Sequence, residues 1–170
     1  MIFSISFACE CSEFVSIEDE FHGTEFIIHG QVIKIRNVSL VETLNPTLID
    51  SVRGSFDDEQ NRAALLQAKI IEEVELEVCY IYKGKIEEEH ITIYTYRSGA
   101  SCGYIHFEED KEFIVYASDN YSGFWFGQLD GIKGKKRKEN TYWTNQCTRT
   151  DEFSIGENSA LEKLIEKEKH

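Results

Sequence analysis

Alternating apolar and polar residues in two stretches constrain the fold of this 170-residue chain more than any other feature. Residues 70–82 contain Val-Glu-Leu-Glu-Val, and residues 90–96 read His-Ile-Thr-Ile-Tyr-Thr-Tyr. Successive side chains of a β-strand point to opposite faces, so this period of two predicts strands with one buried face. Residues 26–35 and 111–117 are rich in β-branched and aromatic residues and predict two further strands.

Helices are expected near both ends of the chain. Ser16 is placed to cap a helix within residues 12–23, with Asp19 as its capping-box partner and Gly23 at its end. Residues 158–170 have an amphipathic helical pattern. Its apolar face comprises Ala160, Leu161, Leu164 and Ile165.

The remaining segments complete a mainly β pattern. Residues 37–56 hold the only proline, Pro46, and predict a long loop, whereas residues 57–67 predict a short helix. Residues 124–126 and 142–147 predict short strands. Strands and helices do not alternate as they do in parallel α/β proteins, which argues against a parallel sheet. The predicted fold class is therefore mainly β, with five or six strands in a small antiparallel barrel, closed or partly closed, flanked by helices.

Charge and motifs exclude several function classes. The chain has 18 Lys and Arg against 31 Asp and Glu, a net charge of −13, which disfavours nucleic acid and anionic membranes as partners. The basic run 133–138 is the exception, and we interpret it as a solvated turn. No apolar run reaches the ~18 residues of a membrane-spanning helix. No recognised catalytic or phosphate-binding motif occurs, so we expect neither an enzyme nor a cofactor.

The first eight residues, MIFSISFA, have the character of the end of an export signal. Small residues lie three positions and one position before Cys9, as signal-peptidase sites require. We therefore interpret residues 1–8 as the remnant of such a signal. An ordinary first strand and a lipid-modified Cys9 are the alternatives. The expected location is outside the cytoplasm: secreted, periplasmic or lipid-anchored at the cell envelope.

The cysteine count is odd, so at least one cysteine is unpaired or pairs with another chain. The five are Cys9, Cys11, Cys79, Cys102 and Cys147. Cys79 lies in a predicted strand, and we expect a buried free thiol there. For an exported chain the other four predict two disulfides, whose pairing the residues alone leave open. A mixed metal site at Cys102 and His106 is the alternative.

Four stretches of the chain resemble the tissue inhibitor of metalloproteinases (TIMP) and netrin-like module family, particularly its bacterial members. They are Ala8-Cys-Glu-Cys11, Tyr82-Lys-Gly84, Ser-Cys-Gly-Tyr-Ile-His-Phe at 101–107 with Glu-Phe-Ile-Val-Tyr-Ala at 112–117, and Cys147-Thr-Arg-Thr150. The resemblance implies a single domain over residues 9–170 with a five-stranded OB-type barrel. It also implies the disulfides Cys9–Cys102 and Cys11–Cys147, which leaves Cys79 free.

The resemblance further implies a mode of action. In the animal inhibitors the mature chain begins at the first cysteine, whose α-amino nitrogen and carbonyl oxygen chelate the zinc of the target metalloprotease. Cys9 would take that role after removal of residues 1–8, with no metal site of the chain's own. The implied inhibitory ridge comprises Cys9, Glu10, Cys11, Ser12, Gly99, Ala100 and Ser101.

Glu10 is the main departure from the inhibitor pattern. It occupies the position whose side chain enters the protease S1′ pocket, where a small or apolar residue is usual, and an unpaired carboxylate there is costly. The alternative function is therefore a netrin-like protein-binding module without inhibitory chemistry. Its candidate docking features are the acidic surface and an aromatic cluster, which we otherwise interpret as core packing. That cluster comprises Tyr121, Phe124, Trp125, Phe126, Tyr142 and Trp143.

Overall fold

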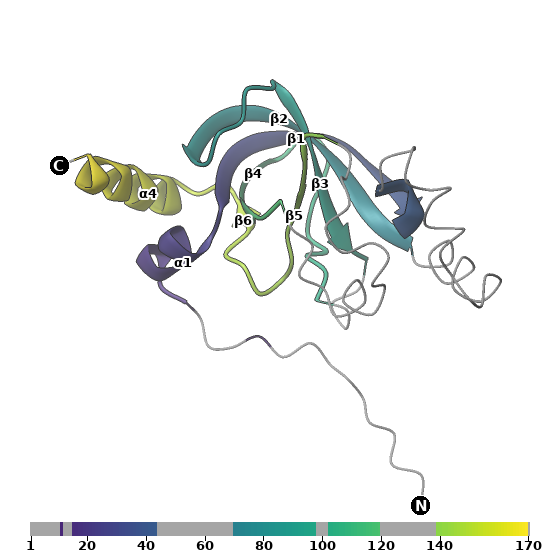
Figure 1. Ribbon diagram of the computed structural model, residues 1–170, viewed down its shortest axis with the longest axis horizontal. Helices are drawn as coiled ribbons and strands as arrows, with labels where there is room; N and C mark the ends of the chain where they lie inside the picture. Colours follow the sequence, from purple (N-terminus) through teal and green to yellow (C-terminus); the bar gives the residue numbers. More distant parts are fainter. Residues whose placement is uncertain (1–10, 12–14, 44–69, 98–101, 120–138, 170) are drawn as a thin grey trace, which may run out of the picture.

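The computed structural model describes residues 11, 15–43, 70–97, 102–119 and 139–169 (Figure 1). These residues form a mainly β structure, as predicted. The strands are β1 (Phe26–Ser39), β2 (Ile70–Lys83), β3 (His90–Tyr96), β4 (Glu112–Ala117), β5 (Thr141–Trp143) and β6 (Asp151–Glu152). The helices are α1 (Ile17–Gly23), a 3-10 turn η1 (Leu40–Thr43) and α4 (Ile155–Glu168).

The six strands form one curled half-barrel sheet in the order β5-β3-β2-β1-β4-β6 (Figure 1). An isolated antiparallel bridge between Ser118 and Trp143 joins the end of β4 to β5. The backbone N–H of each of these two residues donates to the carbonyl of the other, at 2.8 and 3.0 Å. Strands β1, β2, β3, β5 and β4 therefore form a partly closed ring, which is the barrel expected from the sequence.

Two features of the sheet differ from the expectation. β5 pairs with β3 in parallel, and β6 is an additional two-residue strand on β4. A parallel pair requires a long connection between its strands. Here the connection from β3 to β5 runs through residues 97–140 and contains β4. Such pairing depends on where the ring closes, which the alternation within a strand does not reveal.

Strand boundaries agree closely with the sequence pattern except in β1 and β5. β5 ends at Trp143, so the expected strand over 142–147 was wrong for residues 144–147. The bounds of β3 are those predicted, and β2 ends one residue later, before Gly84 with its left-handed φ of 94°. β1 continues to Ser39, so the prediction of a loop from residue 37 was wrong for its first three residues. Pairing with the start of β2, such as Ser39 with Ile70, extends the strand there. The predicted elements at 57–67, 124–126 and 133–138 lie outside the described residues.

Two hydrophobic clusters lie on opposite faces of the sheet. Neighbouring residues of β1 show the division, because Ile28 belongs to the barrel interior and Ile27 to a cluster beneath the helices, both fully buried. In β4 all five residues 113–117 are buried for the same reason. A strand covered on both faces reads as a continuous apolar run, which explains why β4 lacks alternation.

The two helices lie beside one another at one end of the sheet (Figure 1). The hydroxyl of Ser16 accepts a hydrogen bond from the Asp19 N–H, so the predicted cap of α1 is present. α4 begins three residues earlier than predicted, because Ser154 caps it by accepting from the Glu157 N–H. Of its predicted apolar face, Leu161 is fully buried and the other three residues are partly buried.

Replacing Leu161 with alanine is expected to lower the free energy of unfolding by about 3 kcal/mol, because it leaves a cavity between α4 and the sheet. Urea denaturation measures the loss. Ile155→Ala is the matched control in the same helix, since that side chain is 79% exposed and its truncation should leave stability within about 0.5 kcal/mol of wild type. Equal losses for the two variants would contradict the packing of α4 described above.

Within the described part of the chain, no helix is both long and apolar enough to cross a membrane.

Candidate functional site

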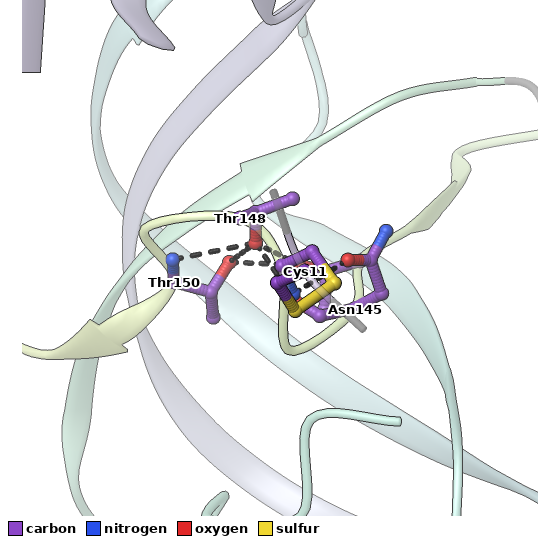
Figure 2. Close-up of a disulfide and its surroundings, with 6 residues drawn as sticks. Cys11, Asn145, Thr148 and Thr150 are labelled. Atoms are coloured by element: carbon purple, nitrogen blue, oxygen red, sulfur yellow. Dashed lines mark hydrogen bonds between the residues drawn. A yellow bond between two sulfur atoms is a disulfide. The ribbon is translucent and has the colours of Figure 1, made fainter. Parts of the chain in front are cut away.

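A disulfide between Cys11 and Cys147 fastens the segment that precedes α1 to the loop between β5 and β6 (Figure 2). The two Cα atoms lie 5.2 Å apart although 136 residues separate them in sequence. This is one of the two bridges implied by the family resemblance. Cys102 is also disulfide-bonded. Its implied partner, Cys9, lies outside the described residues.

Of the seven residues of the implied inhibitory ridge, the structure describes one, Cys11. The other six, Cys9, Glu10, Ser12, Gly99, Ala100 and Ser101, lie outside the described residues, so the ridge stays a prediction. The segments that flank it are described. The Gln146 N–H donates to the Cys102 carbonyl at 3.0 Å, which holds the Cys102 segment against the loop that carries Cys147.

Threonine hydroxyls in residues 144–150 complete the open edge of β4. The Tyr116 N–H donates to Thr150 Oγ1 at 3.0 Å, and the Thr144 hydroxyl donates to the Tyr116 carbonyl at 2.8 Å. Thr144 and Thr150 also bond to one another at 2.7 Å, and Thr148 lies beside them next to the disulfide (Figure 2). The hydroxyls therefore satisfy the backbone N–H and the carbonyl of the buried Tyr116, between the β6 pairing at residues 113–114 and the bridge at Ser118.

Arg149 joins this loop to both helical segments. Its Nε and Nη2 donate to the two carboxylate oxygens of Glu157 in α4 at 2.9 and 2.8 Å, and its Nη1 donates to the Val15 carbonyl before α1 at 3.2 Å. The Tyr116 hydroxyl donates to Glu157 as well, at 2.6 Å. Burial raises the pKa of Glu157, but the hydrogen bonds from Arg149 and Tyr116 and the charge of Arg149 outweigh it and hold the pKa below 4.5.

Glu157→Gln is expected to lower the free energy of unfolding at pH 7 by about 2 kcal/mol, because it removes the charge that Arg149 pairs with in a site only 16–29% exposed. The pKa of Glu157 is depressed in the folded state, so its contribution is complete above pH 4.5 and is lost as pH falls through the folded pKa. The variant should therefore lose less stability than wild type on acidification below pH 4.5. Urea denaturation as a function of pH measures both effects.

Glu18→Gln provides the matched control, because its partner Lys167 lies on the exposed side of the same two helices. Solvent screens that pair, so we expect no measurable change in the urea midpoint at pH 7. If Glu157→Gln had the same pH dependence of unfolding free energy as wild type, the stabilising role of the Arg149–Glu157 pair would be contradicted.

The expectation of a buried thiol at Cys79 was wrong, because Cys79 is free and exposed. It occupies the same strand face as Glu75 and Glu77, which are exposed too. Partial burial and the nearby charge of Glu112 raise the pKa of the thiol, so it is a poor nucleophile. The period of two already placed this residue on the solvent face of β2.

A pocket of about 640 Å³ lies directly beneath the disulfide. The Cys11–Cys147 bridge, Val15, Tyr104 and Ile114 contribute apolar walls. Its charged lining comprises Glu20, Arg149, Asp151, Glu152 and Glu157, together with His106. Sequence reasoning missed this pocket, because its walls come from four separated segments that only the fold brings together.

The aromatic cluster and the possible metal sites give less support for a functional site than the pocket does. Tyr142 and Trp143 are buried, which fits the packing interpretation of the aromatic cluster, and its other four members lie outside the described residues. Among the described residues, no group of three or more His, Cys, Asp or Glu side chains is arranged to hold a metal ion.

No protein-family model matches the chain, and no curated protein matches it either.

Proposed function

We propose that the chain is a non-catalytic binding module that operates in an oxidising compartment outside the cytoplasm. Its binding surface for a protein partner is the end of the barrel at the Cys11–Cys147 bridge. The observation that carries the proposal is that bridge, which attaches an N-terminal segment to the loop between β5 and β6, itself hydrogen-bonded to β4 and α4. Structural disulfides persist in oxidising compartments, which supports the location.

Pre-organisation supports binding at this end of the barrel. The N-terminal segment is held by the bridge at Cys11 and by the hydrogen bond from Arg149 to Val15, while Gln146 holds the Cys102 segment alongside. A segment anchored at Cys11 and Val15 loses less conformational entropy when a partner binds than an untethered one does.

A zinc metalloprotease is the specific partner that we propose to test. Cys9 lies two residues before the anchored Cys11, so a chain that begins at Cys9 would present its α-amino group from a tethered position. An α-amino group with a pKa near 7.7–8 deprotonates readily and is then a good zinc ligand. Glu10 would select a protease whose S1′ pocket offers a cation.

The first experiment is intact mass and peptide mapping of the protein exported by a bacterial host from the full gene. A mature chain that begins at an unmodified Cys9, with Cys9–Cys102 and Cys11–Cys147 closed, would support the proposal. A product retained in the cytoplasm with reduced cysteines would contradict the proposed location.

A panel of zinc endopeptidases then tests inhibition by two chains that differ by one residue, one beginning at Cys9 and one with an added alanine before it. Zinc chelation predicts inhibition only by the first chain, and Glu10→Thr should broaden the range of proteases inhibited. Equal inhibition by both chains would overturn the chelating mechanism. Inhibition by neither chain would overturn it too and would leave the non-inhibitory binding module.

A further inference from the structure

We propose that the pocket beneath the Cys11–Cys147 bridge receives a basic side chain, most favourably arginine, from an extended segment of the protein partner. This inference rests on the proposed binding function and names the chemistry that its site recognises. The pocket volume of about 640 Å³ falls in the range of pockets that bind ligands.

The charge of the pocket lining selects a cation. Four carboxylates line it against one guanidinium, with His106 as the other titratable side chain. The single cation, Arg149, has both of its donor faces occupied by Glu157 and the Val15 carbonyl. Glu20 and Asp151 therefore carry charge that Arg149 does not neutralise, whereas Glu152 is paired with Lys111 outside the lining. A ligand with positive charge compensates the first two.

The polar partners of those carboxylates leave acceptor capacity free. Glu20 accepts one hydrogen bond from the Thr24 hydroxyl at 3.2 Å, and Asp151 accepts from the Tyr104 hydroxyl at 3.3 Å and from the Glu152 N–H at 2.9 Å. Glu152 forms an ion pair with Lys111 at 3.3 Å. An ionised carboxylate has about four lone-pair sites, so each can accept further bonds from a guanidinium.

The apolar walls fit the aliphatic part of such a side chain. Val15 is half-buried and both cysteines of the bridge are exposed, so this apolar part of the lining can cover the methylene stem of an arginine while its guanidinium reaches the carboxylates. A strongly hydrated small cation would gain nothing from these walls.

Exposed apolar residues near the pocket favour a protein segment over a free amine. Ile105 is 49% exposed and lies between the lining residues Tyr104 and His106. Ile155 is 79% exposed and follows the lining residue Ser154. Covering such exposed apolar side chains with residues that flank the arginine is favourable, because it removes apolar surface from water.

The test is an NMR titration of the isotope-labelled full chain, with the Cys11–Cys147 bridge closed, using the peptide Ac-Gly-Leu-Arg-Leu-Gly-NH2. We expect the backbone signals of Tyr104, His106, Gln146 and Thr148 to move, with an affinity that falls as salt is added. The citrulline peptide has the same shape without the charge and should bind at least tenfold more weakly. Free agmatine, which lacks the flanking leucines, should also bind more weakly.

Matched variants assign the effect to the pocket. The double variant Glu20→Gln, Asp151→Asn keeps the hydrogen-bond acceptors for Thr24 and Tyr104 but removes two negative charges. It should lower the affinity for the arginine peptide at least fivefold. The double variant Glu88→Gln, Glu89→Gln removes two charges from the exposed turn before β3 and should leave affinity within twofold.

Several outcomes would overturn the inference. They are equal affinity for the citrulline peptide, equal weakening by both double variants, agmatine binding as tightly as the peptide, or signals at the pocket that stay unmoved. Pocket signals that move when the basic run 133–138 is neutralised, with no peptide present, would also overturn it, because the chain's own basic run would then fill the pocket. The proposed function is tested separately, by the bridges and the start of the mature chain, so either idea can fail alone.

Discussion

Replacing Cys11 and Cys147 together by serine is expected to lower the free energy of unfolding by about 4–5 kcal/mol. The bridge closes a loop of 136 residues, and in the chain-entropy model a loop of that size restricts the unfolded state by about this amount. Both cysteines are exposed, so replacing them with serine removes little buried apolar surface. The loss of stability therefore measures the effect of the cross-link itself. Urea denaturation should show a lower midpoint together with a steeper dependence on urea, because the unfolded chain becomes less compact.

Cys79→Ser is the control for this variant, since that thiol is free and exposed and should change stability by less than about 0.5 kcal/mol. Hydrogen exchange adds a second readout. Loss of the bridge should accelerate exchange in α1, whose start is held by Cys11 and Arg149, more than in β2 or β3. A double variant within 1 kcal/mol of wild type would contradict the role of the bridge as the anchor of the N-terminal segment.

Gly103→Ala is expected to destabilise the protein by at least about 4 kcal/mol, beyond the usual cost of overpacking. A Cβ at Gly103 would lie 1.7 Å from the Tyr96 carbonyl oxygen and 2.4 Å from its carbon. The obstacle is the backbone of β3, which cannot rotate away as a side chain would, so the segment from Cys102 must move. The glycine of the Cys102-Gly103 pair is therefore required by the close approach of two backbones.

Gly156→Ala provides a matched control, because nothing lies within 4 Å of a Cβ built at that position in α4. Alanine is the better helix former, so this variant should be neutral or more stable by up to about 1 kcal/mol. Thermal and urea denaturation measure the stabilities of the two variants relative to wild type. A Gly103→Ala variant as stable as wild type would show that the Cys102 segment is held less tightly against β3 than the structure indicates.

The resemblance to TIMP and netrin-like modules gave specific expectations, of which the structure describes a part. The Cys11–Cys147 bridge is present, and the Cys147-Thr-Arg-Thr150 stretch acquires a physical explanation. Its cysteine anchors the N-terminal segment, its arginine binds α4, and its last threonine completes the edge of β4. These roles depend on residues distant in sequence. The sequence motif therefore pointed to this stretch but did not reveal its contacts.

The sequence by itself determined the local features of this protein. In the middle of β2 a period of two places Val74 and Leu76 inward and Glu75 and Glu77 outward. Serine caps set the starts of both helices, and Gly84 ends β2. These features depend on residues within a few positions of one another, whose conformational preferences are strong enough to decide the outcome locally.

Only the tertiary structure decided how those pieces meet. The parallel pairing of β5 with β3, the short β6, the contact of Arg149 with Val15 across 134 residues and the acidic pocket beneath the bridge all join distant segments. Bringing such segments together costs chain entropy, which is recovered only when the whole barrel closes and buries both clusters. No short stretch of the sequence contains that balance, which is why the candidate site emerges only in the folded chain.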